Sequence, residues 1–265
     1  MKFAFSTLGI PGLPIPEVVA LAAASGYQGV ELRTHPEEPV HRGMGRRDRA
    51  LVVEEFERAG IEIVGLAGYA RVAKADVDED QLRQELEELL SLARDLGAPF
   101  IRVFPGGGDQ TADEADTLAA RRLAAAAETA TDYGVRILLE THDSHRTGKD
   151  AARVLGPVGH QQVGVVWDVM HTWLGGESPI TTHGILAPHL GYVQVKDIAS
   201  AEDKTPLPLG AGVLPLGECL ALLDDSTWVC WEYEKRWYPQ AADLPALLAP
   251  GRAYLEGLIR EHRRG

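Results

Sequence analysis

Four side chains that can bind a metal through oxygen follow four apolar segments in the second half of the chain. They are Glu140 after 137–139, Asp168 after 163–167, Gln194 after 192–193 and Glu232 after 228–231. Short apolar runs of this kind are typical of strands buried on both faces, as in parallel sheets. The polar residues are spaced by 28 (140 to 168), 26 (168 to 194) and 38 (194 to 232) positions, enough for a helix and a return to the sheet. The pattern predicts consecutive parallel strands, each ending in a polar residue.

In a closed parallel barrel these four residues would meet at the carboxyl-terminal mouth, where barrel active sites lie. Three carboxylates at close range cannot all stay ionised without a cation, so Glu140, Asp168 and Glu232 predict one divalent metal ion, with the Gln194 carbonyl as fourth ligand. An all-oxygen set favours Mn²⁺ or Mg²⁺, with Zn²⁺ or Co²⁺ as alternatives. Each carboxylate alone could instead cap a loop or form an ion pair, and Gln194 could hydrogen-bond to substrate or a neighbour.

Three residues close to these ligands are further candidates. His142 and His171 follow Glu140 and Asp168 by two and three positions, and each could contact substrate hydroxyls or only orient a carboxylate. Lys196 lies two residues after Gln194 and therefore shares its side of the strand. It could polarise a substrate oxygen as a catalytic residue, or form a structural ion pair with Glu232 or Asp168.

Candidate substrate contacts also occur elsewhere in the chain. Arg33 and Arg102 lie in two earlier strands and could hold a hydroxyl or carboxylate. Glu31 could brace Arg102 or Lys196, or it could contact substrate. Trp237 could pack against the apolar face of a sugar ring or against the rim of the barrel. The segment 105–108 offers backbone amides for an anion, although no lysine follows it as in phosphate-binding loops.

The elements that would position these residues alternate along the chain. Four times a predicted helix ends at a glycine shortly before a new strand, at Gly26, Gly60, Gly97 and Gly134. We expect strands at 3–5, 29–33, 61–66, 100–104, 137–140, 163–167, 192–193 and 228–231. We expect helices at 16–24, 48–59, 78–96, 111–133, 149–155, 179–186, 215–223 and 244–262.

Eight such repeats predict one α/β domain over residues 1–265, a single (β/α)₈ TIM barrel. The alternative is an open doubly wound sheet, but its nucleotide-binding form would have a G-x-G-x-x-G turn after the first strand, and residues 6–12 lack it.

Composition limits the classes of partner. The chain is 45% hydrophobic and 25% charged, and no apolar run approaches the roughly 20 residues that cross a bilayer. No signal-peptide pattern is found at Met1, and Cys219 and Cys230 are too few for a disulfide framework, so we expect a cytoplasmic protein with no membrane partner. A net charge of −13 argues against a nucleic-acid partner.

Taken together, these segments resemble the xylose isomerase-like barrel superfamily of sugar phosphate isomerases and epimerases. The resemblance covers nearly the whole chain and is carried by the segments 26–33, 139–142, 167–171, 193–197, 210–215 and 231–234. It implies that Glu140, Asp168, Gln194 and Glu232 bind a divalent metal and that His171 approaches the substrate. Many members have a histidine where this chain has Gln194; the glutamine is similar to members that dehydrate dehydroshikimate or inosose.

The leading hypothesis is a divalent-metal-dependent isomerase or epimerase that acts on a small sugar, sugar phosphate or polyol. Glu140 and Glu232 would remove and return a proton beside a carbonyl through a metal-stabilised enediolate. The alternatives are a metal-dependent dehydratase and a barrel that binds sugar without turnover. The DNA-repair endonuclease branch is disfavoured, because it uses a histidine-rich multi-zinc site. Such barrels often pair, so a homodimer remains open.

Overall fold

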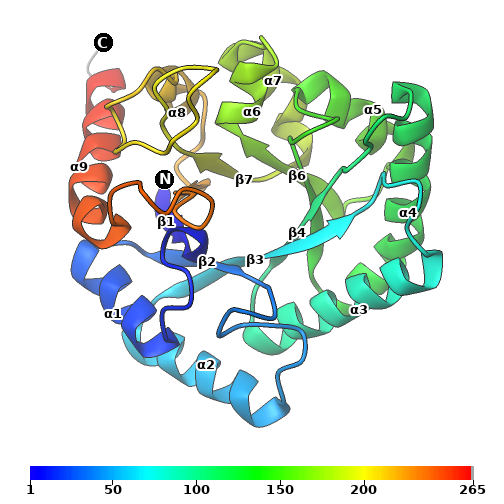
Figure 1. The fold of residues 1–265 in the computed structure, drawn as a ribbon, viewed down its shortest axis with the longest axis horizontal. Helices are drawn as coiled ribbons and strands as arrows, with labels where there is room; N and C mark the ends of the chain where they lie inside the picture. The colour runs from blue at the N-terminus through cyan, green and yellow to red at the C-terminus, as the bar shows by residue number, and fades with distance from the viewer. Residues whose placement is uncertain (264–265) are drawn as a thin grey trace.

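The computed structural model describes residues 1–263 and has a closed barrel of parallel strands at its centre (Figure 1). Each strand pairs with the next in the chain, and the last pairs with the first. The strands are β1 (Lys2–Ser6), β2 (Gly29–Arg33), β3 (Glu62–Arg71), β4 (Phe100–Phe104), β5 (Arg136–Glu140), β6 (Val163–Asp168), β7 (Leu190–Val195) and β8 (Trp228–Trp231). The predicted (β/α)₈ TIM barrel is confirmed.

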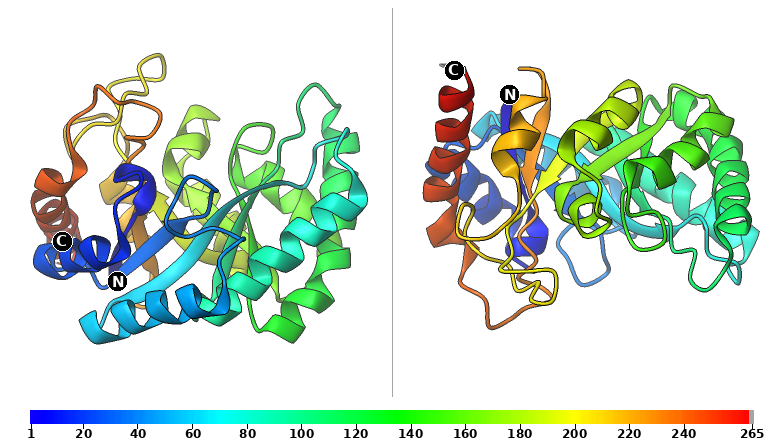
Figure 2. Two further views of the ribbon diagram at one scale, coloured as in Figure 1. Left: turned by 60° about the horizontal axis from the view of Figure 1, so that its bottom comes forward. Right: turned by 90° about the horizontal axis from the view of Figure 1, so that it is seen from above.

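The helices form a ring outside the strands (Figures 1 and 2). They are α1 (Ile15–Ser25), α2 (Arg46–Ala59), α3 (Glu79–Leu96), α4 (Ala112–Tyr133), α5 (Gly148–Val158), α6 (Val169–Leu174), α7 (Pro179–Leu186), α8 (Leu216–Ala221) and α9 (Leu244–His262), with short 3₁₀ turns η1 (Thr7–Gly9) and η2 (Ala187–His189). None of the helices within residues 1–263 combines the length and apolar composition needed to span a lipid bilayer.

Local sequence signals fix where several helices begin and end. Asp78 caps α3 by accepting from the Gln81 N–H, and Thr111 and Glu114 form a reciprocal capping box at α4. The first four long helices, α1 to α4, end at glycines with φ between 66° and 76°, a left-handed conformation that costs glycine little. These caps return the chain to the sheet.

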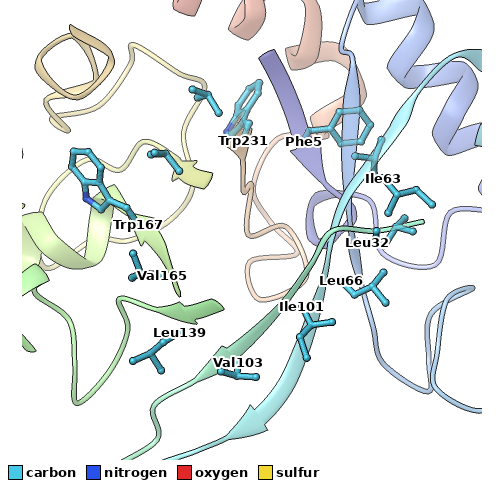
Figure 3. Close-up of a cluster of buried hydrophobic side chains, with 14 of the residues drawn as sticks. Phe5, Leu32, Ile63, Leu66, Ile101, Val103, Leu139, Val165, Trp167 and Trp231 are labelled. Atoms are coloured by element: carbon cyan, nitrogen blue, oxygen red, sulfur yellow. The ribbon is translucent and has the colours of Figure 1, made fainter. Parts of the chain in front are cut away.

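Two apolar clusters lie on opposite sides of the strand wall. The larger joins outward-facing strand residues to the helices, and its members in Figure 3 include Leu139, Trp167 and Trp231. The smaller cluster lies inside the barrel, and all of its buried members belong to strands: Ala4, Val64, Leu138, Val166, Tyr192, Trp228 and Cys230. Successive strand residues point to opposite faces, so the residues next to Leu139, Trp167 and Trp231 face the interior. Those neighbours include Glu140, Asp168 and Glu232.

The two largest differences between the structure and the predicted elements are an additional helix and a longer third strand. Residues 169–174 form α6, a short helix that the sequence analysis did not predict because it is too short to show a helical repeat. Strand β3 extends to Arg71, five residues beyond the predicted end, because Ala67 to Arg71 continues to pair with β4 across a bulge. The extension carries Tyr69 to the mouth of the barrel.

Two long segments rise from the carboxyl-terminal mouth after β7 and β8 (Figure 2). Asp197 organises the first, because its carboxylate accepts backbone N–H groups from Ile198, Gly210, Gly212 and Leu214. The second touches the first where the Tyr233 hydroxyl donates to the Pro206 carbonyl at 3.3 Å. These segments form one side of the mouth.

Candidate metal centre and substrate cavity

The four predicted ligands lie at the carboxyl ends of neighbouring strands. Glu140 and Asp168 are the last residues of β5 and β6, Gln194 lies in β7 opposite Asp168, and Glu232 follows β8 directly. All four are buried. One oxygen from each of the three carboxylates lies within 4.8 Å of the other two, which is close enough for all three to bind one ion. The structure therefore brings together carboxylates that are up to 92 residues apart (140 to 232).

The bonding of these oxygens fits a divalent cation. Glu140 Oε2, Asp168 Oδ2 and Gln194 Oε1 are buried and accept no hydrogen bond from any residue between 1 and 263. Buried acceptors normally have a donor. Glu140 Oε2 and Asp168 Oδ2 each lie within ion-pair distance of a buried arginine or lysine, whereas Gln194 Oε1 has no positive partner among residues 1–263 and is free to bind a cation. The donor set contains only oxygen, as Mn²⁺ and Mg²⁺ prefer.

Two buried cations face the carboxylates. Lys196 Nζ lies 2.8 Å from Asp168 Oδ2 and also pairs with Glu232, while Arg102 Nε lies 3.1 Å from Glu140 Oε2. Burial alone would lower the pKa of Lys196, but Asp168 and Glu232 raise it well above its ordinary value. Lys196 is thus held as a cation behind the cluster, which matches the ion pair weighed as its alternative role.

The charge of the cluster is not fully balanced. Burial raises the pKa of Glu140 to about 8, and Glu232 and Asp168 add to the rise although Arg102 opposes it. A cation bound beside Glu140 would stabilise its carboxylate form and so lower the raised pKa.

Two histidines lie side by side next to Glu140. The ring centroids of His142 and His171 are 4.1 Å apart. His142 Nδ1 lies 3.3 Å from an oxygen of Asp143; burial alone would lower the pKa of His142, but this carboxylate and Glu140 raise it. Burial lowers the pKa of His171 well below its usual value, and the nearby His142 adds to that effect. The two rings therefore favour opposite protonation states.

Glu140, His142 and His171 also form a second group of potential metal ligands. It shares Glu140 with the carboxylate cluster, so one ion could not satisfy both sets fully. The carboxylate cluster fits a cation better, because all of its members are buried and it carries more negative charge.

A cavity of about 170 Å³ opens above this cluster. Its walls include six predicted residues, namely Glu140, Glu232, His142, His171, Arg102 and, at the rim, Trp237, which is 52% exposed. Arg33 does not line the cavity. Its side chain is buried, pairs with Glu38 and donates from Nε to the Tyr69 hydroxyl at 2.7 Å.

Several cavity residues were missed by the sequence analysis. They are Leu8, Tyr69, Phe104, Met170, Lys204 and Glu234. Tyr69 lies beyond the predicted end of the third strand, and Lys204 lies in the long segment after β7. Neither residue is part of a local sequence pattern that indicates a cavity. Phe104 and Met170 were within reach of sequence reasoning, because each neighbours a predicted site segment.

The glycine-rich segment after β4 is used inside the protein. The N–H groups of Gly106 and Gly107 donate to Asp143 Oδ1 and Ser144 Oγ, at 3.0 and 2.9 Å. Two of the amides offered for an anion are thus already bonded, and they hold the segment that carries His142. Glu31 hydrogen-bonds to Tyr192 and Gln194. Burial raises the pKa of Glu31 and the charge of Arg102 opposes that rise, so Arg102 acts on Glu31 through charge although the hydrogen bonds go elsewhere.

Comparison with known proteins supports this architecture. Residues 19–258 match a family model described as a xylose isomerase-like TIM barrel. The chain is 23% identical over 209 residues to a 3-dehydroshikimate dehydratase from Bacillus anthracis, which covers 76% of this chain and 74% of that protein.

Solved structures with the same fold include proteins of different activity. An IOLI protein with a bound zinc atom superposes with a TM-score of 0.81 at 18% identity, over 96% of this chain and 98% of the other. A D-psicose 3-epimerase superposes with a TM-score of 0.80 at 15% identity, over 97% and 99% of the two chains.

Proposed function

The chain belongs to the xylose isomerase-like TIM-barrel family, and we propose that within this family it is a metal-dependent lyase that removes water from a small cyclic keto acid or polyol. The observation that carries the proposal is the pair of adjacent histidines in the cavity wall, of which His142 has a carboxylate partner. Similarity to the 3-dehydroshikimate dehydratase and the glutamine at position 194 support it.

Elimination needs a base for a C–H proton beside a carbonyl and an acid for the departing hydroxyl. His171 is the base, since the lowered pKa of its half-buried ring favours the neutral form, and His142 beside Asp143 is the acid. His171 takes the proton, the C–H electron pair becomes the new C=C bond, and the hydroxyl leaves as water with the proton from His142. Two rings 4.1 Å apart address one face of a substrate, as elimination on a single face requires.

A divalent ion, Mn²⁺ or Mg²⁺, would be held by Glu140, Asp168, Gln194 and Glu232. When bound, it supplies positive charge that stabilises the developing charge on the substrate carbonyl. Arg102 and Lys204 in the cavity wall add positive charge suited to a carboxylate, which favours a keto acid over a neutral polyol.

A second candidate function is epimerisation. Glu140 and Glu232 both line the cavity, from strands β5 and β8, and two carboxylates could exchange a proton on opposite faces of a sugar. Both carboxylates also belong to the proposed metal-binding cluster, and a cation bound by them would occupy the electron pairs that a base needs, which favours the histidine mechanism.

The test is product analysis by NMR in deuterated water. The protein with Mn²⁺ is incubated with 3-dehydroshikimate, with an inosose and with keto-sugars. Elimination predicts a product that has lost water; an epimer labelled with deuterium would support the second function. No turnover, together with a melting temperature raised by the ligand, would indicate a binding protein and contradict both.

Variants assign the roles. His171→Asn should lower kcat by about 10²–10⁴-fold without unfolding the protein, because it removes the base. Glu140→Gln should nearly abolish turnover as well. His189→Asn is the control, since His189 precedes β7 at the opposite end of the barrel. Full activity of His171→Asn would exclude the proposed base.

A further inference from the structure

Glu31 is a wholly buried carboxyl group below the proposed metal ligands. It lies in β2, and its Oε2 atom accepts hydrogen bonds from the Tyr192 hydroxyl and from Gln194 Nε2, the latter at 2.9 Å. Neither partner is near in sequence, since Gln194 is 163 residues away. Glu31 does not line the cavity, so it has no direct access to substrate.

Only the nitrogen of the Gln194 side-chain amide forms hydrogen bonds within residues 1–263. Nε2 also donates to Glu232 Oε1 at 3.1 Å, so both of its hydrogens are directed to carboxylates. Oε1 is buried and accepts no hydrogen bond from residues 1–263. The reversed amide would place Oε1 against two carboxylate oxygens and lose both hydrogen bonds. The contacts therefore select one orientation of the amide.

We infer that Glu31 is a positioning residue that directs the Gln194 carbonyl to the metal as its fourth oxygen ligand. The inference rests on the metal site of the proposed function and explains how a neutral amide serves there. Partners beyond the direct ligands commonly fix ligand orientation, as when a carboxylate binds the second N–H of a metal-bound histidine. In this chain Glu31 does the same for a glutamine.

Tyr192 completes the arrangement. Its hydroxyl donates to the oxygen that accepts from Gln194, which limits rotation of the Glu31 carboxyl group. The surroundings are apolar, since Tyr192 belongs to the inner cluster with Cys230. Without Glu31, Gln194 would have only Glu232 to orient it, and Glu232 is itself a proposed ligand.

The experiment measures Mn²⁺ binding to metal-stripped protein without substrate, with free Mn²⁺ quantified by EPR. Glu31→Met should raise the Kd for Mn²⁺ by about 10–100-fold. Glu31→Gln, which keeps the volume and a polar group, should raise it less. Cys230→Ala is the matched control, because it alters the same buried layer without touching these hydrogen bonds, and it should leave the Kd unchanged. If Glu31→Met does not fold, Glu31→Gln decides the outcome.

A double-mutant cycle separates positioning from general structural support. Gln194→Ala removes the amide, so Glu31→Gln should have no further effect on the Kd in that background. An equal effect of Glu31→Gln in both backgrounds would overturn the inference, as would unchanged binding by folded Glu31 variants or the absence of Mn²⁺ binding by the wild type. Because no substrate is used, coupling between Glu31 and Gln194 can be established even if the proposed dehydration fails.

Discussion

Replacing Asp168 with asparagine tests the metal site with little change in shape. Asp168 Oδ1 accepts the His171 N–H at 3.1 Å and so caps α6. Asparagine keeps an oxygen for this bond, so we expect α6 to remain folded. The substitution removes one of the three clustered negative charges and replaces the Oδ2 atom that lies 2.8 Å from Lys196 Nζ with an amide group.

The size of the effect follows from mass action. Mn²⁺ at one hundred times its Kd would raise the free energy of unfolding by about 2.7 kcal/mol. At roughly 2–4 °C per kcal/mol for a chain of this size, the wild-type melting temperature should rise by roughly 5–11 °C. If Asp168→Asn weakens binding about a hundredfold, the same Mn²⁺ concentration gives about 0.4 kcal/mol, or roughly 1–2 °C.

The assay is thermal unfolding followed by circular dichroism, on EDTA-treated protein with and without MnCl₂. Glu62→Gln is the control, because Glu62 begins β3 at the opposite end of the barrel and forms an exposed pair with Lys2. It should show the full wild-type shift. An equally large Mn²⁺ shift in Asp168→Asn would show that the Asp168 carboxylate does not bind the ion.

Three further predictions concern the stability of the fold. Gly251→Ala should lower the free energy of unfolding in urea by about 1–3 kcal/mol, because the new Cβ would lie 2.3 Å from the Trp231 ring. Gly257→Ala in the same helix is the control: its Cβ meets nothing within 4 Å, so it should raise the free energy of unfolding by about 0.5–1 kcal/mol. Burial would raise the pKa of Asp95, but hydrogen bonds from Arg49 and Arg94 lower it in the folded protein. The Asp95 carboxylate therefore stabilises the folded state fully above the pKa of an unfolded aspartate, about 4. This contribution is lost as the pH falls from there through the lower pKa that Asp95 has in the folded protein. The unfolding free energies of wild type and Asp95→Asn should therefore converge below about pH 4, and a constant difference would contradict this. Asp197→Ala removes the carboxylate that accepts four backbone N–H groups of the segment 198–215. A loss of ~1.4 kcal/mol of local stability should make trypsin cleave this segment about tenfold faster. An unchanged cleavage rate would show that these four hydrogen bonds do not order the segment.

Much of the framework could be predicted because its signals are local. The alternation of apolar runs with helices that end in glycine predicted the (β/α)₈ barrel and most element boundaries. Period-two alternation places Glu140, Asp168 and Gln194 on the inner face of their strands, and the shared direction of parallel strands brings strand-end residues to one mouth. The meeting of the carboxylates thus follows from chain direction and side-chain parity, which short sequence windows contain.

Contacts across the barrel were decided by the tertiary structure alone. The sequence analysis considered Glu31 as a brace for Arg102 or Lys196 or as a substrate contact, but strand register and packing direct its hydrogen bonds to Gln194 and Tyr192. Arg33 likewise does not line the cavity but lies behind its wall, bonded to Glu38 and to the cavity residue Tyr69. The alternation of side chains along a strand predicts which residues face the barrel interior. It does not predict which of the seven other strands such a side chain contacts. That partner depends on the stagger of the closed barrel and on the volumes that fill it, which are properties of the whole chain.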